Sequence, residues 1–568
     1  MNGDSKEKVA REIDKRNKGS SVVFWCDDCK MPVITEVSGV MRRSCPLCAG
    51  TIKYLCVDLR PVFPEERLLA EILLGIPFDW RDKSVWASDN IYYVDGKSVP
   101  LALKKYYDAS IAKVRSSLSQ HQAQNGYDAF SETMRRFVQA NAGRLHWLED
   151  EAFTFIQATA KSYSHEQIVV SFSGGKDSTV TADLAVRALG NAGLVHIFGN
   201  TTLEFPLTLD YVRRFRRNHP MTIFKTVMNK DQDFYEVCKD IGPPARMLRW
   251  CCSMFKTGPI TRILNSLYLD KGILTFYGIR KCESVSRSRY NRIESSADAI
   301  KIHKQKVASP IFHWLDSDIW LYILGKDVDF NDAYRLGYDR VGCWCCPNNN
   351  LRASFLSQIY MPEQAEKWRA FLVDFARSIG KPDAEEYVDS GAWKARQGGN
   401  GLKAAQDVKI RFTNCTTEDH AKVYDLNKPM NDVFLELFIP FGRLALELGR
   451  KILHETIVVD TQTNIPVLAV QPLGNDSVGE SKVKVKTLNV ANHDALQRMV
   501  GYQMKKFNAC RRCLKCESLC KFGAISIAGG VYCINNEKCK RCKMCMTDRY
   551  LEGGCLMQKY LKTKESKT

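Results

Sequence analysis

Cysteine is the residue type that most constrains this chain, because its 22 cysteines are concentrated in three clusters separated by long gaps. Thiols repeated at intervals of two residues are typical metal ligands. No run of about 18 uncharged apolar residues occurs, and the N-terminal segment lacks the apolar core of a secretory signal. We therefore expect a cytoplasmic protein without a membrane span. Reducing conditions disfavour disulfides there, so the clusters predict metal sites.

The first cluster contains two CxxC pairs, Cys26–Cys29 and Cys45–Cys48, separated by 15 residues. Four thiolates at this spacing fit one tetrahedral Zn²⁺, as in a zinc ribbon. Apolar runs beginning at Val22 and Val33 predict the short strands that carry the two pairs. We expect a structural zinc ribbon in residues 1–58, and four unrelated core cysteines are the alternative.

The last cluster repeats a C-x2-C-x2-C pattern near the end of the chain. Its members are Cys510, Cys513, Cys516, Cys520, Cys539, Cys542, Cys545 and Cys555. The pattern closely resembles bacterial-type ferredoxins with two [4Fe–4S] clusters. The resemblance implies that Cys555 joins the first three cysteines and that Cys520 joins the second three. Two departures are Lys521, where the family usually has proline, and the gap of nine residues before Cys555. Zinc is the alternative metal.

The centre of the chain predicts a strand, a glycine-rich turn and a helix. The β-branched run 168–172 predicts a buried strand, and helical spacing continues to Leu189 before Gly190. Such a turn directs backbone N–H groups at phosphate oxygens. The turn resembles the SGGxDS pyrophosphate loop of the adenine-nucleotide α-hydrolase (PP-loop) superfamily. The nucleotide-binding residues implied are Ser173, Gly174, Gly175, Lys176, Asp177 and Ser178.

Four later motifs narrow this resemblance to the phosphoadenosine-phosphosulfate (PAPS) reductase family. They are N-T-T-L-E-F-P at 200–206, G-I-R-x2-E-S-x2-R at 278–287, P-I-x2-W-x3-D-I-W at 310–320 and Y-x2-G-Y-x3-G-C at 334–343. The resemblance spans residues 166 to 350 and implies a doubly wound, mostly parallel α/β sheet. It assigns Thr201, Thr202 and Gly278 to nucleotide binding. It also implies that Lys256, Arg280 and Arg287 hold the anionic end of the nucleotide.

The middle cysteines fit the same family. The pair Cys251 and Cys252, with Cys343 and Cys346, resembles the [4Fe–4S] site of adenylyl-sulfate reductases. Zinc satisfies four thiolates equally well, and Cys345 is a spare thiol that could replace a ligand. Cys282 lies inside the arginine motif, where nearby cations favour a thiolate, so it is a candidate catalytic thiol. An ordinary free cysteine is the alternative.

The remaining segments supply no recognisable motif. Residues 59–110 predict a β-rich module with a hairpin at 91–97, and a PUA-like RNA-binding module is the alternative to a plain spacer. Residues 111–165 have helical spacing. We expect the PAPS-reductase-like domain over 166–360, a helical or mixed linker region over 361–504 and the ferredoxin domain over 505–560.

The leading hypothesis is an iron–sulfur enzyme that binds PAPS or adenylyl sulfate and reduces it to sulfite with electrons delivered through its ferredoxin domain. The donor that supplies these electrons stays unidentified. Two features differ from thiol-dependent reductases: the chain lacks a C-terminal E-C-G-L-H motif, and its SGGKDS loop is intact. The intact loop suits ATP, so the alternative is ATP-dependent thiolation of tRNA or DNA. The net charge of +18 suits nucleic acid as well. A redox-sensing regulator is a third hypothesis. The sequence leaves the oligomeric state open.

Overall fold

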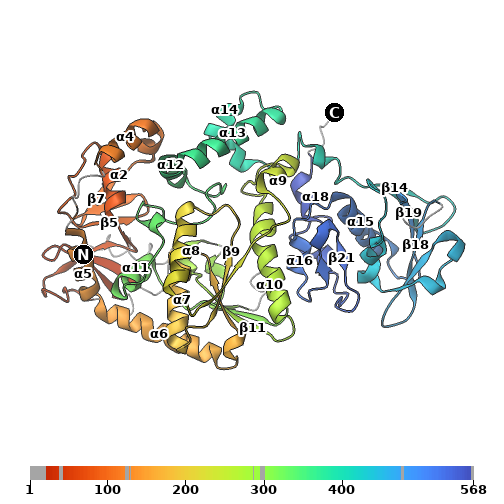
Figure 1. Cartoon of the computed structure of the whole chain (residues 1–568), viewed down its shortest axis with the longest axis horizontal. Helices are drawn as coiled ribbons and strands as arrows, with labels where there is room; N and C mark the ends of the chain where they lie inside the picture. The colour runs from red at the N-terminus through yellow and green to blue at the C-terminus, as the bar shows by residue number, and fades with distance from the viewer. Residues whose placement is uncertain are drawn as a thin grey trace, which may run out of the picture.

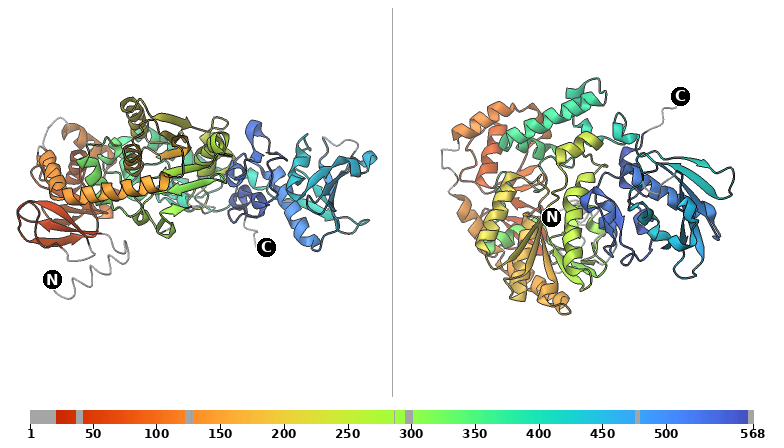
Figure 2. Two further views of the ribbon diagram at one scale, coloured as in Figure 1. Left: turned by 90° about the horizontal axis from the view of Figure 1, so that it is seen from below. Right: turned by 45° about the vertical axis from the view of Figure 1, so that its right-hand side comes forward.

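Four structural regions follow one another along the long axis of the molecule (Figures 1 and 2). The coordinates are a computed structural model that describes residues 21–36, 42–121, 127, 129–285, 287–294, 301–474 and 479–563. The N-terminal sheets occupy one end, the large parallel sheet the middle and an antiparallel sheet the other end. The cysteine-rich tail lies between the last two regions. The predicted absence of a secretory signal concerns residues outside this description.

The N-terminal end contains two small sheets. Strands β1 (Ser21–Cys26), β2 (Met31–Glu36) and β3 (Ile52–Cys56) form a sheet in the order β2-β1-β3. Asn141 fastens this sheet to the helices, because its side chain accepts a hydrogen bond from the Ile34 N–H and donates to the Pro32 carbonyl. Strands β4 (Arg60–Pro61), β5 (Val85–Ser88), β6 (Ile91–Val94) and β7 (Lys97–Pro100) form the second sheet. The pairing of β6 with β7 confirms the predicted hairpin.

Helices connect these sheets to the central domain. The predicted β-rich segment also contains a helix, α2 (Pro64–Leu74), whose C-cap Gly75 adopts a left-handed conformation. Among the described residues of the next segment, the helical spacing corresponds to three α-helices. The helices up to the central sheet are α3 (Leu103–Asp108), α4 (Ile111–His121), α5 (Ala129–Ala140) and α6 (Ala142–Ala160). Among the described residues, no helix is both long enough and apolar enough to cross a membrane.

The central sheet has six strands in the order β10-β9-β8-β11-β13-β12, and only β12 runs antiparallel to its neighbour. Its strands are β8 (Ile168–Phe172), β9 (Val195–Gly199), β10 (Ile223–Val227), β11 (Ile273–Tyr277), β12 (Ile293–Glu294) and β13 (Gln305–Ala308). Side chains alternate between its two faces. Val170 and Phe172 face the core that contains α7 (Lys176–Leu189), whereas Val169 packs with Leu264 of α10 (Gly258–Tyr268). Burial on both faces explains why β8 and β11 are almost continuously apolar.

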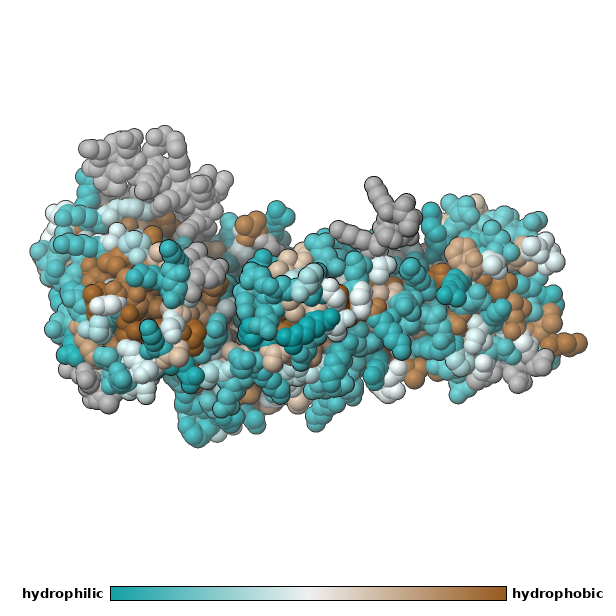
Figure 3. All heavy atoms as spheres, turned by 90° about the horizontal axis from the view of Figure 1, so that it is seen from above, coloured by the Kyte–Doolittle hydropathy of each residue, from teal (hydrophilic) through white to brown (hydrophobic). Residues whose placement is uncertain are grey.

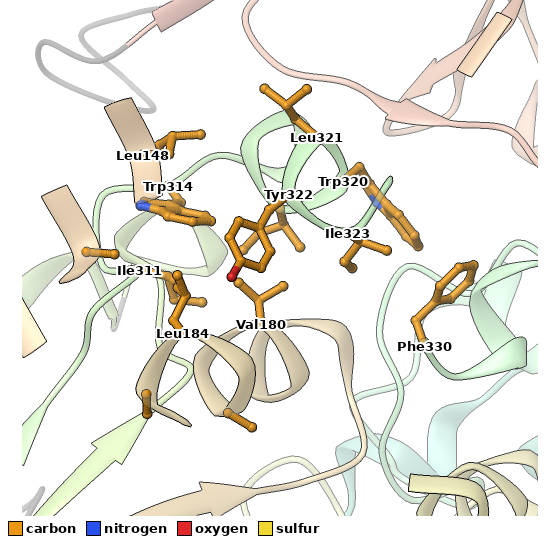
Figure 4. Close-up of a cluster of buried hydrophobic side chains, with 14 of the residues drawn as sticks. Leu148, Val180, Leu184, Ile311, Trp314, Trp320, Leu321, Tyr322, Ile323 and Phe330 are labelled. Atoms are coloured by element: carbon orange, nitrogen blue, oxygen red, sulfur yellow. The ribbon is translucent and has the colours of Figure 1, made fainter. Parts of the chain in front are cut away.

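Helix α11 (Asp316–Gly325) completes the core beside α6 and α7. Figure 4 shows Trp314 and Tyr322 facing Val180 and Leu184 of α7, with Trp320 turned toward Phe330. Tyr322 is fully buried, and its hydroxyl donates to Asp183 at 2.6 Å. This packing holds the N-terminus of α11 against the loop that precedes α7. This part of the chain also contains the helices α8 (Pro206–Asn218), α9 (Phe234–Ile241), α12 (Leu351–Tyr360), α13 (Pro362–Ser378) and α14 (Ala384–Asp389).

The region expected as a mixed linker contains a six-stranded antiparallel sheet. Its order is β14-β15-β19-β18-β17-β16. The strands are β14 (Arg411–Asn414), β15 (Ala421–Asp425), β16 (Arg443–Ala445), β17 (Thr456–Val459), β18 (Pro466–Pro472) and β19 (Lys482–Thr487). Apolar side chains from alternate positions of β18 and β19 form its core with α15 (His493–Ala509). Figure 3 shows hydrophilic residues over most of the middle of the molecule and apolar patches at its two ends.

Candidate functional site

The SGGKDS loop lies at the C-terminal end of β8, and its own side chains hold it in shape. The Ser178 hydroxyl donates to the Gly175 carbonyl at 2.8 Å and accepts from the Ser173 N–H at 3.1 Å. Gly174 has a φ of +74°, and a Cβ there would lie 2.9 Å from Thr208 Cγ2. A side chain is therefore excluded at this position both by conformation and by space.

Residues from distant parts of the chain support the same loop. The Asn331 side chain donates to the Gly174 carbonyl at 3.0 Å, and the Tyr334 hydroxyl accepts from the Lys176 N–H at 3.1 Å. Gly278, at the end of β11, approaches the loop so closely that a Cβ would lie 2.6 Å from the carbonyl carbon of Asp177. The loop is thus clamped between β8, β11 and the segment before α12.

Charged side chains beneath the loop form a buried network. Lys176 Nζ lies 3.3 Å from Asp316 Oδ1, and the Arg280 guanidinium contacts both Asp316 and Asp177 at 2.6 Å. Burial opposes the ionised form of Asp316, but Lys176 and Arg280 outweigh it and lower the pKa of this carboxyl to about 2. Lys176 and Arg280 are therefore already paired with carboxylates. Arg280, which the sequence predicts to hold the nucleotide anion, makes both of these carboxylate contacts.

Asp58 links the N-terminal sheet to the network. Its carboxylate accepts hydrogen bonds from the backbone N–H groups of Asp316 and Ser317, both at 2.9 Å, and so caps α11. Burial, followed by the neighbouring Asp316 charge, raises the pKa of Asp58 to about 7. Sequence reasoning missed Asp58, because no pattern connects residues 258 positions apart. It also missed Asp316, which lies inside the recognised motif at 310–320, and Asn331, which precedes the motif at 334–343.

Thr201 and Thr202, predicted to bind nucleotide, follow β9 in different environments. Thr201 is buried, and its hydroxyl donates to Glu204 at 2.7 Å. Thr202 is exposed and has a φ of +66°. Arg287 contacts Glu283 and is less buried than Arg280. Of the three predicted anion-binding cations, Lys256 is the exposed one, and it lies on the same side as the central cysteines.

The four central cysteines come from two segments that meet beyond the strand ends. Cys251 and Cys252 lie where the π-helical turn Cys252–Thr257 begins, and Cys343 and Cys346 lie on the loop after the last family motif. Pairing of Glu204 with Cys343, and a hydrogen bond from the Trp344 N–H to the Leu203 carbonyl at 2.9 Å, tie the second segment to the chain that follows β9. The pKa of Arg249 is raised by three nearby thiols, those of Cys252, Cys346 and Cys251. Three of the four central cysteines therefore lie near the same guanidinium group. This donor set fits a [4Fe–4S] cluster.

The two other central thiols have different surroundings. Cys345 is 4% exposed and packs in an apolar core with Trp250 and Leu203, and it still interacts with Cys343 and Cys346. Cys282 receives a hydrogen bond from Arg280 at 3.2 Å. Burial nevertheless outweighs this cation and raises the pKa of Cys282 to about 11. The predicted thiolate at Cys282 is therefore wrong, because desolvation is the larger effect.

The tail cysteines occupy two turns with the same backbone conformation. In the first turn Arg512 and Leu514 have positive φ, and in the second Arg541 and Lys543 do. Left-handed residues other than glycine are uncommon, so their repetition marks two equivalent C-x2-C-x2-C turns. Each is followed by a short helix, and a third helix follows the last cysteine. The elements of the tail are α16 (Lys515–Leu519), β20 (Ile525–Ser526), β21 (Cys533–Ile534), α17 (Met544–Thr547) and α18 (Leu556–Leu561).

The tail thiols interact in two adjacent sets. Burial raises the pKa of Cys513, and Cys516, Cys555 and Cys510 raise it further. Cys545 interacts with Cys542 and Cys539, and the Cys520 pKa, raised by burial, is also raised by Cys545. The ferredoxin resemblance implies the same two sets, and Cys516 interacts with cysteines of both. Four thiols in each set fit two [4Fe–4S] clusters.

The N-terminal cysteines form a compact donor set of their own. The sulfur atoms of Cys26, Cys29, Cys45 and Cys48 all lie within 4.8 Å of one another. Three of the four side chains are buried, and the sheet β2-β1-β3 supplies the strands next to them. Four thiols within this distance fit a tetrahedral Zn²⁺ ion.

Comparison with protein-family models matches residues 167–349 to the phosphoadenosine phosphosulfate reductase domain. Residues 167–349 are a PAPS reductase domain. The chain is 34% and 31% identical to two uncharacterised proteins of Methanocaldococcus jannaschii, over 47% and 46% of its length. It covers only 54% and 61% of those two relatives. It is also 26% identical to adenosine 5′-phosphosulfate reductase 1 of Bacillus subtilis, over 37% of this chain and 86% of that protein.

Solved structures also resemble part of this chain. A phosphoadenylyl-sulfate reductase from Candida auris aligns at 18% identity and a TM-score of 0.28, covering 34% of this chain and 89% of that one. A U34-tRNA thiolase from Methanococcus maripaludis aligns at 16% identity and a TM-score of 0.26, covering 44% of this chain and 80% of that one. The domain has an α/β fold with a mostly parallel sheet.

Proposed function

We propose that this protein is an iron–sulfur enzyme that binds an adenylylated sulfate at its PAPS reductase domain and reduces it to sulfite. The match over residues 167–349 and the reductases among the relatives support nucleotide-linked sulfur chemistry. In this reaction two electrons reduce the sulfur, the S–O bond to the nucleotide phosphate breaks, and sulfite leaves with the adenosine phosphate. An external donor supplies the electrons.

The backbone N–H groups of the SGGKDS loop and the N-terminus of α7 would bind the nucleotide phosphates. Lys256 is the exposed cation beside the cysteine site, so it is the side chain best placed to contact the sulfate end. Arg280 and Lys176 would instead keep Asp177 and Asp316 in position. The central cysteines would hold one [4Fe–4S] cluster, the tail cysteines two, and the N-terminal cysteines one Zn²⁺. Bound iron–sulfur clusters would supply single-electron transfer.

One observation carries the proposal: the tail and the central cysteines share a hydrophobic core. Cys513 and Cys555 of the tail pack in the same cluster as Trp250 and Phe255. Tyr560 of α18 joins the two sites, because it accepts a backbone hydrogen bond from Arg249 and interacts with both Cys513 and Cys251. Redox groups carried by the tail would therefore lie beside the nucleotide-binding domain, where an electron-consuming reaction can use them.

The second candidate is ATP-dependent thiolation of tRNA or DNA. Its specific support is the intact SGGKDS loop, whose internal hydrogen bonds and close contact with Gly278 leave the phosphate-binding backbone of an ATP site unaltered. This reaction would release pyrophosphate and depend on a nucleic acid acceptor.

The test uses anaerobically purified full-length protein. We expect about twelve iron atoms and one zinc per chain, from three clusters of four and one tetrahedral site. We expect sulfite release from PAPS or adenylyl sulfate with a chemically reduced low-potential donor. Cys346→Ser should abolish sulfite release and lower the iron content, whereas Cys415→Ser, remote from all three clusters in sequence, should change neither. Pyrophosphate release from ATP that requires tRNA or DNA, without sulfite, would instead establish the second candidate.

A further inference from the structure

A groove of about 1080 Å³ runs between the antiparallel sheet and the tail. Its walls come from β14, β15, α15, α18 and the chain just before β14. Helix α15 packs against both α18 and β19, so the groove crosses the boundary between the two regions (Figure 1). Its volume is at the upper limit of ordinary small-molecule sites, which measure roughly 300–1,000 Å³. This size favours a segment of a polymer as the occupant.

The charge of the groove has one sign. Its cations are Lys409, Lys422, Arg498, Lys505, Lys559 and Lys562, and none of the described residues that line it is Asp or Glu. Lys562 pairs with Glu552 at 2.9 Å. Lys409, Lys422, Arg498 and Lys559 make no ion pair with any carboxylate in the described part of the chain. The groove therefore presents at least four uncompensated positive charges, an arrangement that attracts a polyanion.

Aromatic rings alternate with these cations. Phe412 on the edge strand β14 is 47% exposed, and Lys422 Nζ lies 4.7 Å from its ring centroid. The buried Tyr424 supports Phe412 from below, with ring centroids 5.8 Å apart. Tyr502 on α15 is paired in the same way with Lys505, at 5.8 Å. An exposed ring held in place beside cations is a platform on which a base stacks while the cations contact the phosphates.

We propose that this groove binds single-stranded nucleic acid. An acidic peptide would satisfy the cations but would leave Phe412 without a planar partner. A duplex would keep its bases stacked inside the helix, away from the ring. Single-stranded RNA and DNA share the phosphates and free bases that the groove recognises, so both are candidates. The inference concerns binding only and does not depend on which reaction the PAPS reductase domain performs.

The test measures binding of labelled 12-nucleotide oligo-U and oligo-dT to the full-length protein by fluorescence anisotropy at several salt concentrations. The triple variant Lys409→Ala/Arg498→Ala/Lys559→Ala should weaken binding at least tenfold. Because each phosphate contact to a single strand contributes a slope of about −0.7 in log K against log salt, the slope should become shallower by about 2. Phe412→Ala should weaken binding about tenfold with an unchanged slope, since stacking releases no counterions.

The matched control is Lys113→Ala/Lys161→Ala/Arg217→Ala, which removes the same charge from exposed positions on α4, after α6 and on α8. It should leave the affinity within about twofold. Preference for oligo-U or for oligo-dT would support the proposal and identify the natural strand. Unchanged affinity in the groove variants would overturn it. Binding of poly-glutamate or of a duplex as tightly as of the single strands, lost in the same variants, would overturn it as well.

Discussion

The side chain of Asp58 connects the N-terminal sheet to the charged network beneath the nucleotide loop. The ionisation of this side chain makes its contribution to stability depend on pH. Its folded-state pKa of about 7 lies above the ordinary value of 3.8. The folded protein therefore retains a proton that the unfolded chain has lost, so the contribution of Asp58 to stability falls as pH rises from about 4 to 7. Asp316, with a pKa of about 2, titrates below this window.

We predict that Asp58→Asn removes this pH dependence. Asparagine keeps one of the two hydrogen bonds to α11, because its amide has a single acceptor oxygen whereas both oxygens of Asp58 accept. The stability advantage of the wild type over Asp58→Asn should shrink by about 1–3 kcal/mol between pH 5 and pH 8. Thermal unfolding of both proteins at the two pH values measures it. A constant difference between the two proteins would show that Asp58 is ionised throughout.

Gly278 tests the close approach of β11 to the SGGKDS loop. Its Cβ would lie 2.6 Å from the Asp177 carbonyl and 2.7 Å from the Ser178 N–H nitrogen, and both are backbone atoms that cannot rotate away. Gly278→Ala should therefore displace the loop, lower the free energy of unfolding by about 1–3 kcal/mol and weaken adenine-nucleotide binding. Calorimetry with the nucleotide measures both effects.

Gly143 is the matched control for Gly278. It lies in the first turn of α6, and nothing lies within 4 Å of the Cβ that alanine would add. Gly143→Ala should leave nucleotide affinity unchanged and stabilise the protein by up to about 1 kcal/mol, because alanine has the higher helix propensity. Equal losses of affinity in both variants would show that the close approach of Gly278 to the SGGKDS loop does not hold the nucleotide site in shape.

At the level of elements, the small sheet β2-β1-β3 depends on its four cysteines. Its strands are only five or six residues long, so a bound ion would supply much of its stability. Cys45→Ser should reduce zinc content from about one equivalent to well below half and lower the melting temperature. Cys415→Ser, on the antiparallel sheet, should retain zinc. Elemental analysis of both variants decides whether this site holds the metal.

The sequence predicted elements whose signal is local. Strand β8 was placed at its observed bounds, because buried parallel strands consist of continuous β-branched or aromatic runs. The antiparallel sheet over residues 411–487 was not recognised. Strand β14 is exposed throughout, and only β19, with the alternation of Lys482–Thr487, shows a clear two-residue period.

The same contrast applies to the candidate site. The loop and the cysteine clusters were found because their spacing is visible along the chain. The carboxylates that pair with Lys176 and Arg280 are set by tertiary contacts, and Asp58 comes from a different module altogether. The direction of the Cys282 pKa shift also depended on burial, which sequence alone did not supply.

At the scale of the whole molecule, the chain leaves the central domain, forms the antiparallel sheet and returns through α15 to place the tail against α10 (Figure 1). Gly258 permits this contact, because a Cβ there would lie 2.6 Å from Leu514 Cβ. Arg262 of α10 donates hydrogen bonds to both carboxylate oxygens of Glu517 on α16. Its Nε lies 3.0 Å from Oε1 and its Nη2 lies 2.9 Å from Oε2. Glu517 is 6% exposed, so its charge depends on this partner.

We predict that Arg262→Ala loosens the tail from the central domain. Because the substitution leaves a buried carboxylate unpaired, it should cost about 1–3 kcal/mol and increase hydrogen exchange in α16 and α10. Arg369→Ala is the matched control: Arg369 also binds a carboxylate, Asp389, through two contacts at 2.7 Å, but both side chains are over a third exposed. It should cost less than about 1 kcal/mol and leave α16 protected. Equal exchange in the two variants would mean that the apolar core alone, and not this ion pair, holds the tail in place.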